Sequence, residues 1–225
     1  MTDEAEKITP ADVQKALEKS ARFIKAIGDM SSELTYQATK RLNVSSALFQ
    51  ISLEHYAAIH KLIDSSIIGS ASALLRPQYE AYIRATWMAR CATDDQFDSF
   101  CRGRQPPRID KLIEQIEEAG IYERGVLQSY HDERWDHFCD LTHGGAMQAA
   151  SRIGDSGIRP IADIEIALQI LQSSAVIAGI ACIDMPESVG AVEVANTMYL
   201  VYERIYGLNP SILPPPPLHN STNSA

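Results

Sequence analysis

The chain has 225 residues, of which 45% are hydrophobic, and carries a formal net charge of -9. That length is sufficient to bury a hydrophobic core within one domain. The acidic total argues against a protein that wraps nucleic acid, because such proteins usually present a basic face, although it leaves room for a local basic groove. The β-branched and aromatic residues show no sustained alternation, so we expect an all-α fold.

The pattern of hydrophobic residues predicts helices along most of the chain. Proline at position 10, 160 or 186 suits the first turn of a helix, and glycine at 120 or 207 suits the end of one. Thr93 and Gln96 form a capping-box pattern. The predicted helices cover residues 9–29, 33–65, 70–92, 93–101, 108–119, 122–141 with a break near Ser129, 146–153, 161–185 and 187–206.

These segments are joined by short loops, which favours a single up-and-down helical bundle over residues 1–207. The tail, residues 208–225, contains four consecutive prolines and little apolar surface, so we expect it to be extended or disordered. Residues 161–183 are apolar over most of a helix circumference. This pattern predicts a central helix or a dimer interface, and we expect a homodimer formed through the C-terminal helices.

The cysteines and the N-terminus bear on the cellular compartment. The four cysteines form no Cys-x-x-Cys pair and no zinc-type spacing with histidine, so we expect reduced thiols and no metal or cofactor. The N-terminus lacks the basic and apolar regions of a signal peptide. Polar residues interrupt the 161–183 segment, which argues against a membrane span. We therefore expect a cytoplasmic protein that does not bind membranes.

A first charged stripe lies within the predicted helix 70–92. Arg76, Glu80 and Arg84 recur every four residues and therefore share one helix face with Trp87. Pro77 removes a backbone hydrogen bond, so we expect a kink beside Arg76 that frees a carbonyl group. The stripe fits a buried ion-pair network, a functional site or an exposed ladder of ion pairs, in that order of preference.

A second stripe ends at a double glycine. Asp136, Asp140 and His143 share one helix face, and Gly144 and Gly145 follow. The two acids could neutralise the arginines of the first stripe, so we expect the two stripes to face one another. A divalent metal is an alternative that would need donors from another helix. His143 fits either a titrating group that a ligand can approach or a favourable charge at a helix C-terminus.

Two ordered motifs carry a resemblance to a known group of proteins. They are LRPxxEAYxRxxW at residues 75–87 and WxxFxDxxHGGxxQ at residues 135–148. The chain resembles a family of uncharacterised bacterial all-α proteins that have an Arg-Pro-x-x-Glu helix and a later His-Gly segment. That family is distantly similar to HEPN domains, helical bundles found among prokaryotic toxins and defence proteins, many of which are dimeric, metal-independent ribonucleases.

The resemblance implies an HEPN-like bundle, and the two stripes would form its catalytic or nucleotide-binding cavity from Arg76, Glu80, Arg84, Asp140 and His143. The HEPN signature, an arginine followed by a histidine after four to six residues, occurs at Arg124 and His131, but about one such match is expected by chance. Whether the protein is an enzyme therefore stays open. The alternatives are an antitoxin-like interaction module with a cognate protein partner, and a bundle that binds a small molecule or metal.

Overall fold

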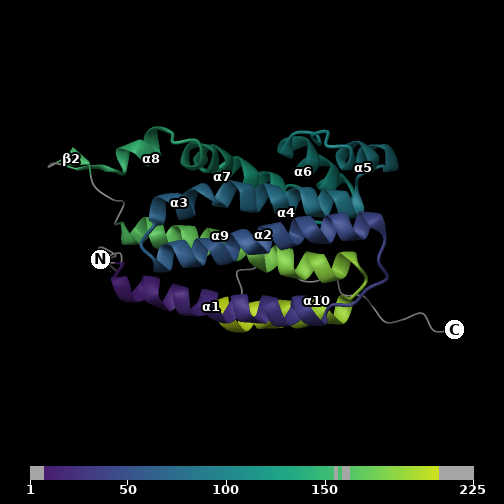
Figure 1. The fold of residues 1–225 in the computed structure, drawn as a ribbon, viewed down its shortest axis with the longest axis horizontal. Coiled ribbons are helices and arrows are strands. Elements are labelled where there is room, and N and C mark those ends of the chain that lie inside the picture. The colour runs from purple at the N-terminus through teal and green to yellow at the C-terminus, as the bar shows by residue number, and fades with distance from the viewer. Residues whose placement is uncertain (1–7, 155–156, 159–162, 208–225) are drawn as a thin grey trace.

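The computed structural model describes residues 8–154, 157–158 and 163–207 and has an all-α fold, as predicted (Figure 1). Its helices are α1 (Pro10–Glu33), α2 (Lys40–Asp64), α3 (Ile68–Ala73), α4 (Leu75–Arg90), α5 (Asp94–Cys101), α6 (Ile109–Glu118), α7 (Val126–Thr142), α8 (Ala146–Ala150), α9 (Ile164–Ser188) and α10 (Val192–Tyr206). The strands β1 (Ile153–Gly154) and β2 (Gly157–Ile158) pair in antiparallel fashion and project from one end.

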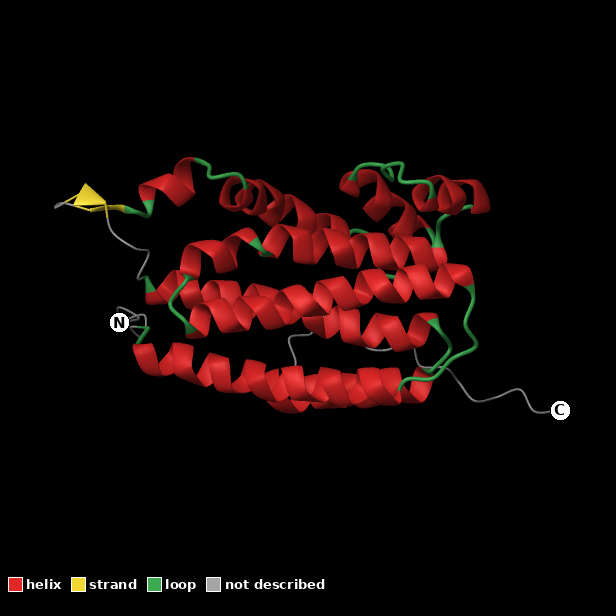
Figure 2. Cartoon of the chain, viewed as in Figure 1, coloured by secondary structure: helices red, strands yellow, loops and turns green. Residues whose placement is uncertain are grey.

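Three helices, α2, α4 and α9, form the centre of the bundle, since each packs against the other two. On one side α1 and α10 pack against α9 and against each other, and on the opposite side α6 and α7 pack against α4. Figure 2 shows the long helices lying side by side along the long axis of the molecule. The elements that carry the two charged stripes, α4 and α7, are therefore neighbours.

A buried polar link crosses this centre. The Gln78 amide nitrogen donates to the Ser174 carbonyl at 2.9 Å, and the Ser174 hydroxyl donates back to the Gln78 side-chain oxygen at 2.7 Å. The Ser52 hydroxyl donates to the Gln78 carbonyl at 2.9 Å. Because buried polar groups are costly when unpaired, these bonds set the register of α2, α4 and α9 along their shared axis.

The proline at position 77 is accommodated by a break between two helices. The predicted helix 70–92 is divided at Leu74 into α3 and α4, which places Pro77 in the first turn of α4, where its missing N–H group costs no intrahelical bond. The carbonyl of Ala73, four residues before Pro77, lies 3.4 Å from the Thr142 hydroxyl, which donates its shorter hydrogen bond, at 2.8 Å, to the Phe138 carbonyl. The Ala73 carbonyl, which the proline leaves without a helical partner, thus faces α7 next to His143.

Several predicted boundaries were wrong, among them the start of the helix predicted at residue 122, since α7 begins at Val126. Residues 34–39 separate α1 from α2, because Thr39 caps α2 by accepting from the backbone N–H of Leu42. Helix α7 runs without a break through Ser129. Pro186 does not start the last helix: it is buried in the final turn of α9, which ends near Gly190, a residue with a positive φ of 82°.

The predicted extended tail and the predicted helix start at Pro160 remain predictions. The tail 208–225 and Pro160 lie outside the described residues. Helix α9 has the length and apolar composition that a membrane span requires, a test that buried core helices also pass. Most of its apolar stretch is buried inside the bundle.

Substitution of Gly179 tests how closely α9 and α10 approach. A Cβ atom at this position would overlap the ring of Tyr202, which is buried. We expect Gly179→Ala to lower the free energy of unfolding by about 1–3 kcal/mol. The matched control is Gly28→Ala in α1, where a Cβ atom meets nothing within 4 Å. That change should raise stability by about 0.5–1 kcal/mol in the same urea titration, and equal effects at both sites would contradict the close approach.

Candidate functional site

The first stripe forms a continuous ion-pair network on α4. Arg76 Nε donates to Glu80 Oε1 at 2.7 Å, and Arg84 Nη2 donates to Glu80 Oε2 at 2.6 Å. The Glu80 side chain is only 15% exposed, so both of its oxygens are engaged by a cation in a partly dry environment. Such charge-assisted bonds are stronger than those of exposed ion pairs. The neighbouring Ile83 and Trp87 are buried, as expected for a partly buried face.

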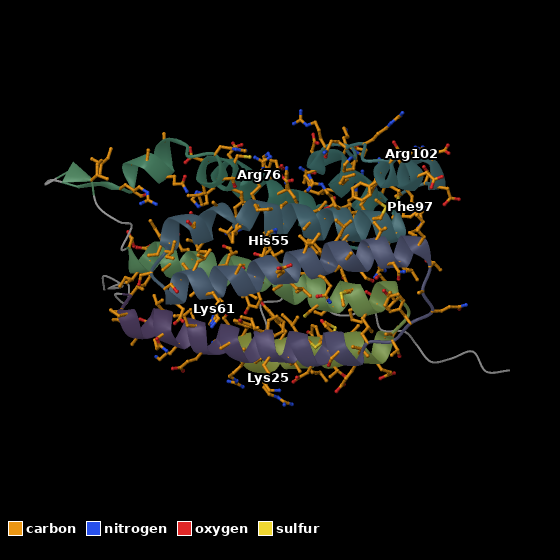
Figure 3. All side chains as sticks on the ribbon, viewed as in Figure 1. Lys25, His55, Lys61, Arg76, Phe97 and Arg102 are labelled. Carbon is orange, nitrogen blue, oxygen red and sulfur yellow. The ribbon has the colours of Figure 1, made fainter. Side chains whose placement is uncertain are left out.

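The second stripe contacts the first through Arg76. Arg76 Nη1 lies 2.5 Å from Nε2 of His143, the residue at the C-terminal end of α7. A guanidinium group can only donate, so Nε2 of His143 accepts this bond. The Arg76 guanidinium also lies 4.7 Å from the centre of the Trp135 ring on α7. Figure 3 shows Arg76 on the α7 side of α4, so the two stripes face one another as the spacing predicts.

The two acids of the second stripe take different positions. Asp136 is exposed, and the carboxylate that pairs with both Arg76 and Arg84 is that of Glu80. Asp140 is half-buried, and its carboxylate fills the space that a Cβ atom of residue 145 would need, which explains the glycine there. The Gly145 N–H also donates to the Asp140 carbonyl at 2.9 Å. Asp140 therefore shapes the turn that presents His143.

Arg124 and His131, the residues of the HEPN-type sequence match, do not lie in one site. His131 is buried between the rings of Tyr79 and Trp135, with ring centroids 6.0 and 4.8 Å away, and its burial lowers its pKa. Arg124 is exposed, in the loop before α7, and lines a hollow with carboxylates of α6. The pair therefore lacks the shared pocket that HEPN-type catalysis needs.

A groove of about 750 Å³ is lined by residues of α3, α4, α7, α9 and α10. Its floor is α9, and its walls come mainly from α7 on one side and α10 on the other, with further contributions from α3 and α4. The apolar lining residues are Ile68, Leu75, Phe138, Leu141, Ile166, Ile170, Ala175, Val176, Tyr202 and Tyr206, and the polar ones include Ser72, Tyr130, Arg134, His137, Gln169, Gln172 and Ser173. No pattern in the sequence indicates this groove, because most of its lining residues come from five separate helices.

A buried acid in the core was also missed. Asp184 on α9 accepts hydrogen bonds from the hydroxyls of Tyr82, Tyr122 and Thr86, at 3.1 Å from Tyr82 and 3.3 Å from Thr86. Burial raises its pKa to about 6, although the Tyr122 hydrogen bond and the charge of Arg90 oppose that shift. The signal in the sequence was a lone acid between Ile183 and Met185, at the end of the most apolar segment.

The described residues contain no group of three or more His, Cys, Asp or Glu side chains arranged to hold a metal ion. The four cysteines are free thiols, and Cys182 is fully buried. Within the described part of the chain, the charged chemistry is therefore concentrated in the Arg76 network, the Asp184 cluster and the groove.

Comparison with known proteins gives a family but no function. Residues 49–208 match a family of unknown function, DUF6988, and because they make up most of the chain, the protein belongs to that family. No curated protein and no solved structure matches the chain. The matched region contains both charged stripes, the groove and the Asp184 cluster.

Replacing Asp184 tests whether it keeps a proton in the folded chain. Its pKa is raised from 3.8 to about 6, so between these values the folded chain holds a proton that the unfolded chain has lost. Stability then falls as pH rises through that window. Relative to Asp184→Asn, the free energy of unfolding should drop by about 3 kcal/mol from about pH 4 to about pH 6 and then level off. If the free energies of unfolding of the native chain and of Asp184→Asn changed in parallel with pH, Asp184 would not hold the extra proton in the folded chain.

Proposed function

We propose that this member of the DUF6988 family binds a small organic molecule in the groove between α7, α9 and α10. The observation that carries the proposal is the groove itself, whose volume of about 750 Å³ lies within the range of about 300–1,000 Å³ common among ligand pockets. It is lined mostly by apolar side chains and has a few polar groups at fixed positions, a combination typical of ligand sites.

The walls of the groove are held in place independently of any ligand. Tyr202 packs on Gly179 and stacks with Tyr206, with ring centroids 4.8 Å apart, which fixes the α10 wall. The α7 wall is held on α4 by the Arg76–His143 and Thr142–Ala73 contacts. A preformed site of this kind loses little conformational entropy on binding.

Filling the groove is expected to abolish binding. Ser173 lies in the groove on α9, and the indole of Ser173→Trp would occupy it. The neutral fluorescent probe N-phenylnaphthylamine should brighten on binding to the native chain and stay near its background emission with Ser173→Trp. The matched control is Ser129→Trp, an exposed position on α7 outside the groove lining, which should bind like the native chain.

Circular dichroism and thermal unfolding would establish that both tryptophan variants are folded. A native chain that does not bind the probe, or a folded Ser173→Trp variant that binds it with unchanged affinity, would overturn the proposed site.

A second candidate is the RNA-cleaving function of an HEPN-like dimer, favoured by the contact between Arg76 and the exposed His143. In that function Arg76 and Arg84 would hold a phosphate, and His143 would take the proton of a 2′-hydroxyl as it attacks phosphorus and the 5′-oxygen leaves. Arg76 occupies Nε2 of His143 in this structure, so RNA would have to draw Arg76 to its phosphate to free that nitrogen. Glu80 pairs with both arginines and neutralises one of their two charges, which favours instead a non-enzymatic module locked by this network.

Replacement of His143 separates these alternatives. If His143 transfers the proton, His143→Ala should reduce cleavage of single-stranded RNA by about 10²–10⁴-fold. His55→Ala on α2 (Figure 3) is the control, because His55 lies on a helix outside the network and should leave cleavage unchanged. Equal rates in the native chain and His143→Ala would exclude His143 from any cleavage reaction.

A further inference from the structure

Arg134 of α7 lines the groove. Building on the proposed function, we infer that the ligand is an amphipathic organic monoanion, whose carboxylate pairs with Arg134 while its hydrocarbon part lies between α7 and α9. The inference rests on the environment of this arginine, on two neighbouring side chains that carry hydroxyl groups and on the large apolar side chains beyond it.

Arg134 differs from the other half-buried arginines of the described residues. Arg41, Arg76, Arg84 and Arg90 each pair with a carboxylate at 2.6–3.0 Å. Arg134 is half-buried as well, but no carboxylate of the described residues lies within ion-pair distance of it. Its buried Nε has no hydrogen-bond partner among them, a feature that it shares with Arg84 and Arg90. A partly desolvated cation without an anion is unfavourable. An anion from outside the described chain would remove that cost.

Two side chains that carry hydroxyl groups, Ser173 and Tyr130, lie beside the Arg134 guanidinium and could bind the same anion. Arg134 Nη1 donates to the Ser173 hydroxyl at 3.3 Å, and the guanidinium lies 5.1 Å from the centre of the Tyr130 ring. The Tyr130 hydroxyl is buried and, among the described residues, has no hydrogen-bond partner. Burial raises the pKa of Tyr130 to about 12, against the opposing charge of Arg134, so this hydroxyl remains a donor at neutral pH.

Beyond Arg134 the groove is lined by large apolar side chains, with His137, Gln169 and Gln172 among them. The α7 wall presents Tyr130, Arg134, Phe138 and Leu141, which share one face of that helix. The apolar pair lies four and seven residues beyond Arg134, or about 6 and 10 Å along the helix axis. On α9 the corresponding residues before Ser173 are apolar as well, namely Ile166 and Ile170. A hydrocarbon chain attached to the bound anion would therefore lie along these side chains.

The charge of the site favours a monoanion over a phosphate dianion. Arg134 supplies one full positive charge, and a dianion would leave a negative charge unpaired in a partly dry groove. A planar carboxylate also suits the donor fork of a guanidinium group. A carboxylate with an apolar chain suits both Arg134 and the apolar side chains beyond it.

Matched carboxylates and alcohols would test the inference by isothermal titration calorimetry. Octanoate and decanoate, kept below their micelle-forming concentrations, should bind the native chain, and each added methylene should tighten Kd by about fourfold. Octanol and decanol should bind about 10–100-fold more weakly, because they cannot form a charge-assisted bond with Arg134. Arg134→Gln should bring the carboxylates down to the affinity of the alcohols, and Arg134→Lys should restore part of it.

The control is Arg124→Gln, which removes the same charge from an exposed position that lines a different hollow. Unchanged carboxylate binding by this variant is expected. Equal affinity for carboxylates and alcohols in the native chain would overturn the charge selectivity but leave the groove as a binding site. Failure of both ligand series and of N-phenylnaphthylamine to bind would overturn the proposed function itself.

Discussion

The pair of hydrogen bonds between Gln78 and Ser174 is the constraint from which the arrangement of both candidate sites follows. It fixes α4 against α9 in one register, and the Ser52 bond to the Gln78 carbonyl adds α2 to the same unit. Because two residues span about 200° of a helix, a Gln78 that faces α9 turns Glu80 toward the opposite side, where α7 lies. The buried link in the core thereby determines where the charged stripe is presented.

The break at Leu74 completes the attachment of α7. Pro77 has no N–H group to donate to the carbonyl of Ala73, and the Thr142 hydroxyl of α7 lies against that carbonyl. The next residue, His143, accepts a hydrogen bond from Arg76. The glycine at 145 then allows the Asp140 side chain to fill the turn. The Arg-Pro and His-Gly segments, which are far apart in sequence, are therefore two halves of one helix-to-helix junction.

The sequence predicted these junction residues better than it predicted the pockets. The four-residue spacing of Arg76, Glu80 and Arg84 was sufficient to place them on one face, because helical periodicity is a local property. The predicted helix boundaries were less accurate. Thr39 and Gly190 set the ends of helices more strongly than the hydrophobic pattern did, and the burial of Pro186 outweighed the tendency of proline to start a helix. The groove and the Asp184 cluster depend on which helices meet, which no local pattern contains.

The groove is present because α7 packs against α4. The contacts of Arg76 and Thr142 hold α7 over α3 and α4, while α10 is drawn toward α1 by the rings of Tyr202 and Tyr206 packed around Phe23. The face of α9 between α7 and α10 is therefore only partly covered and forms the floor of the groove. In the function that we propose, the ion-pair network therefore acts indirectly, because it holds the α7 wall of the groove that Arg134 lines.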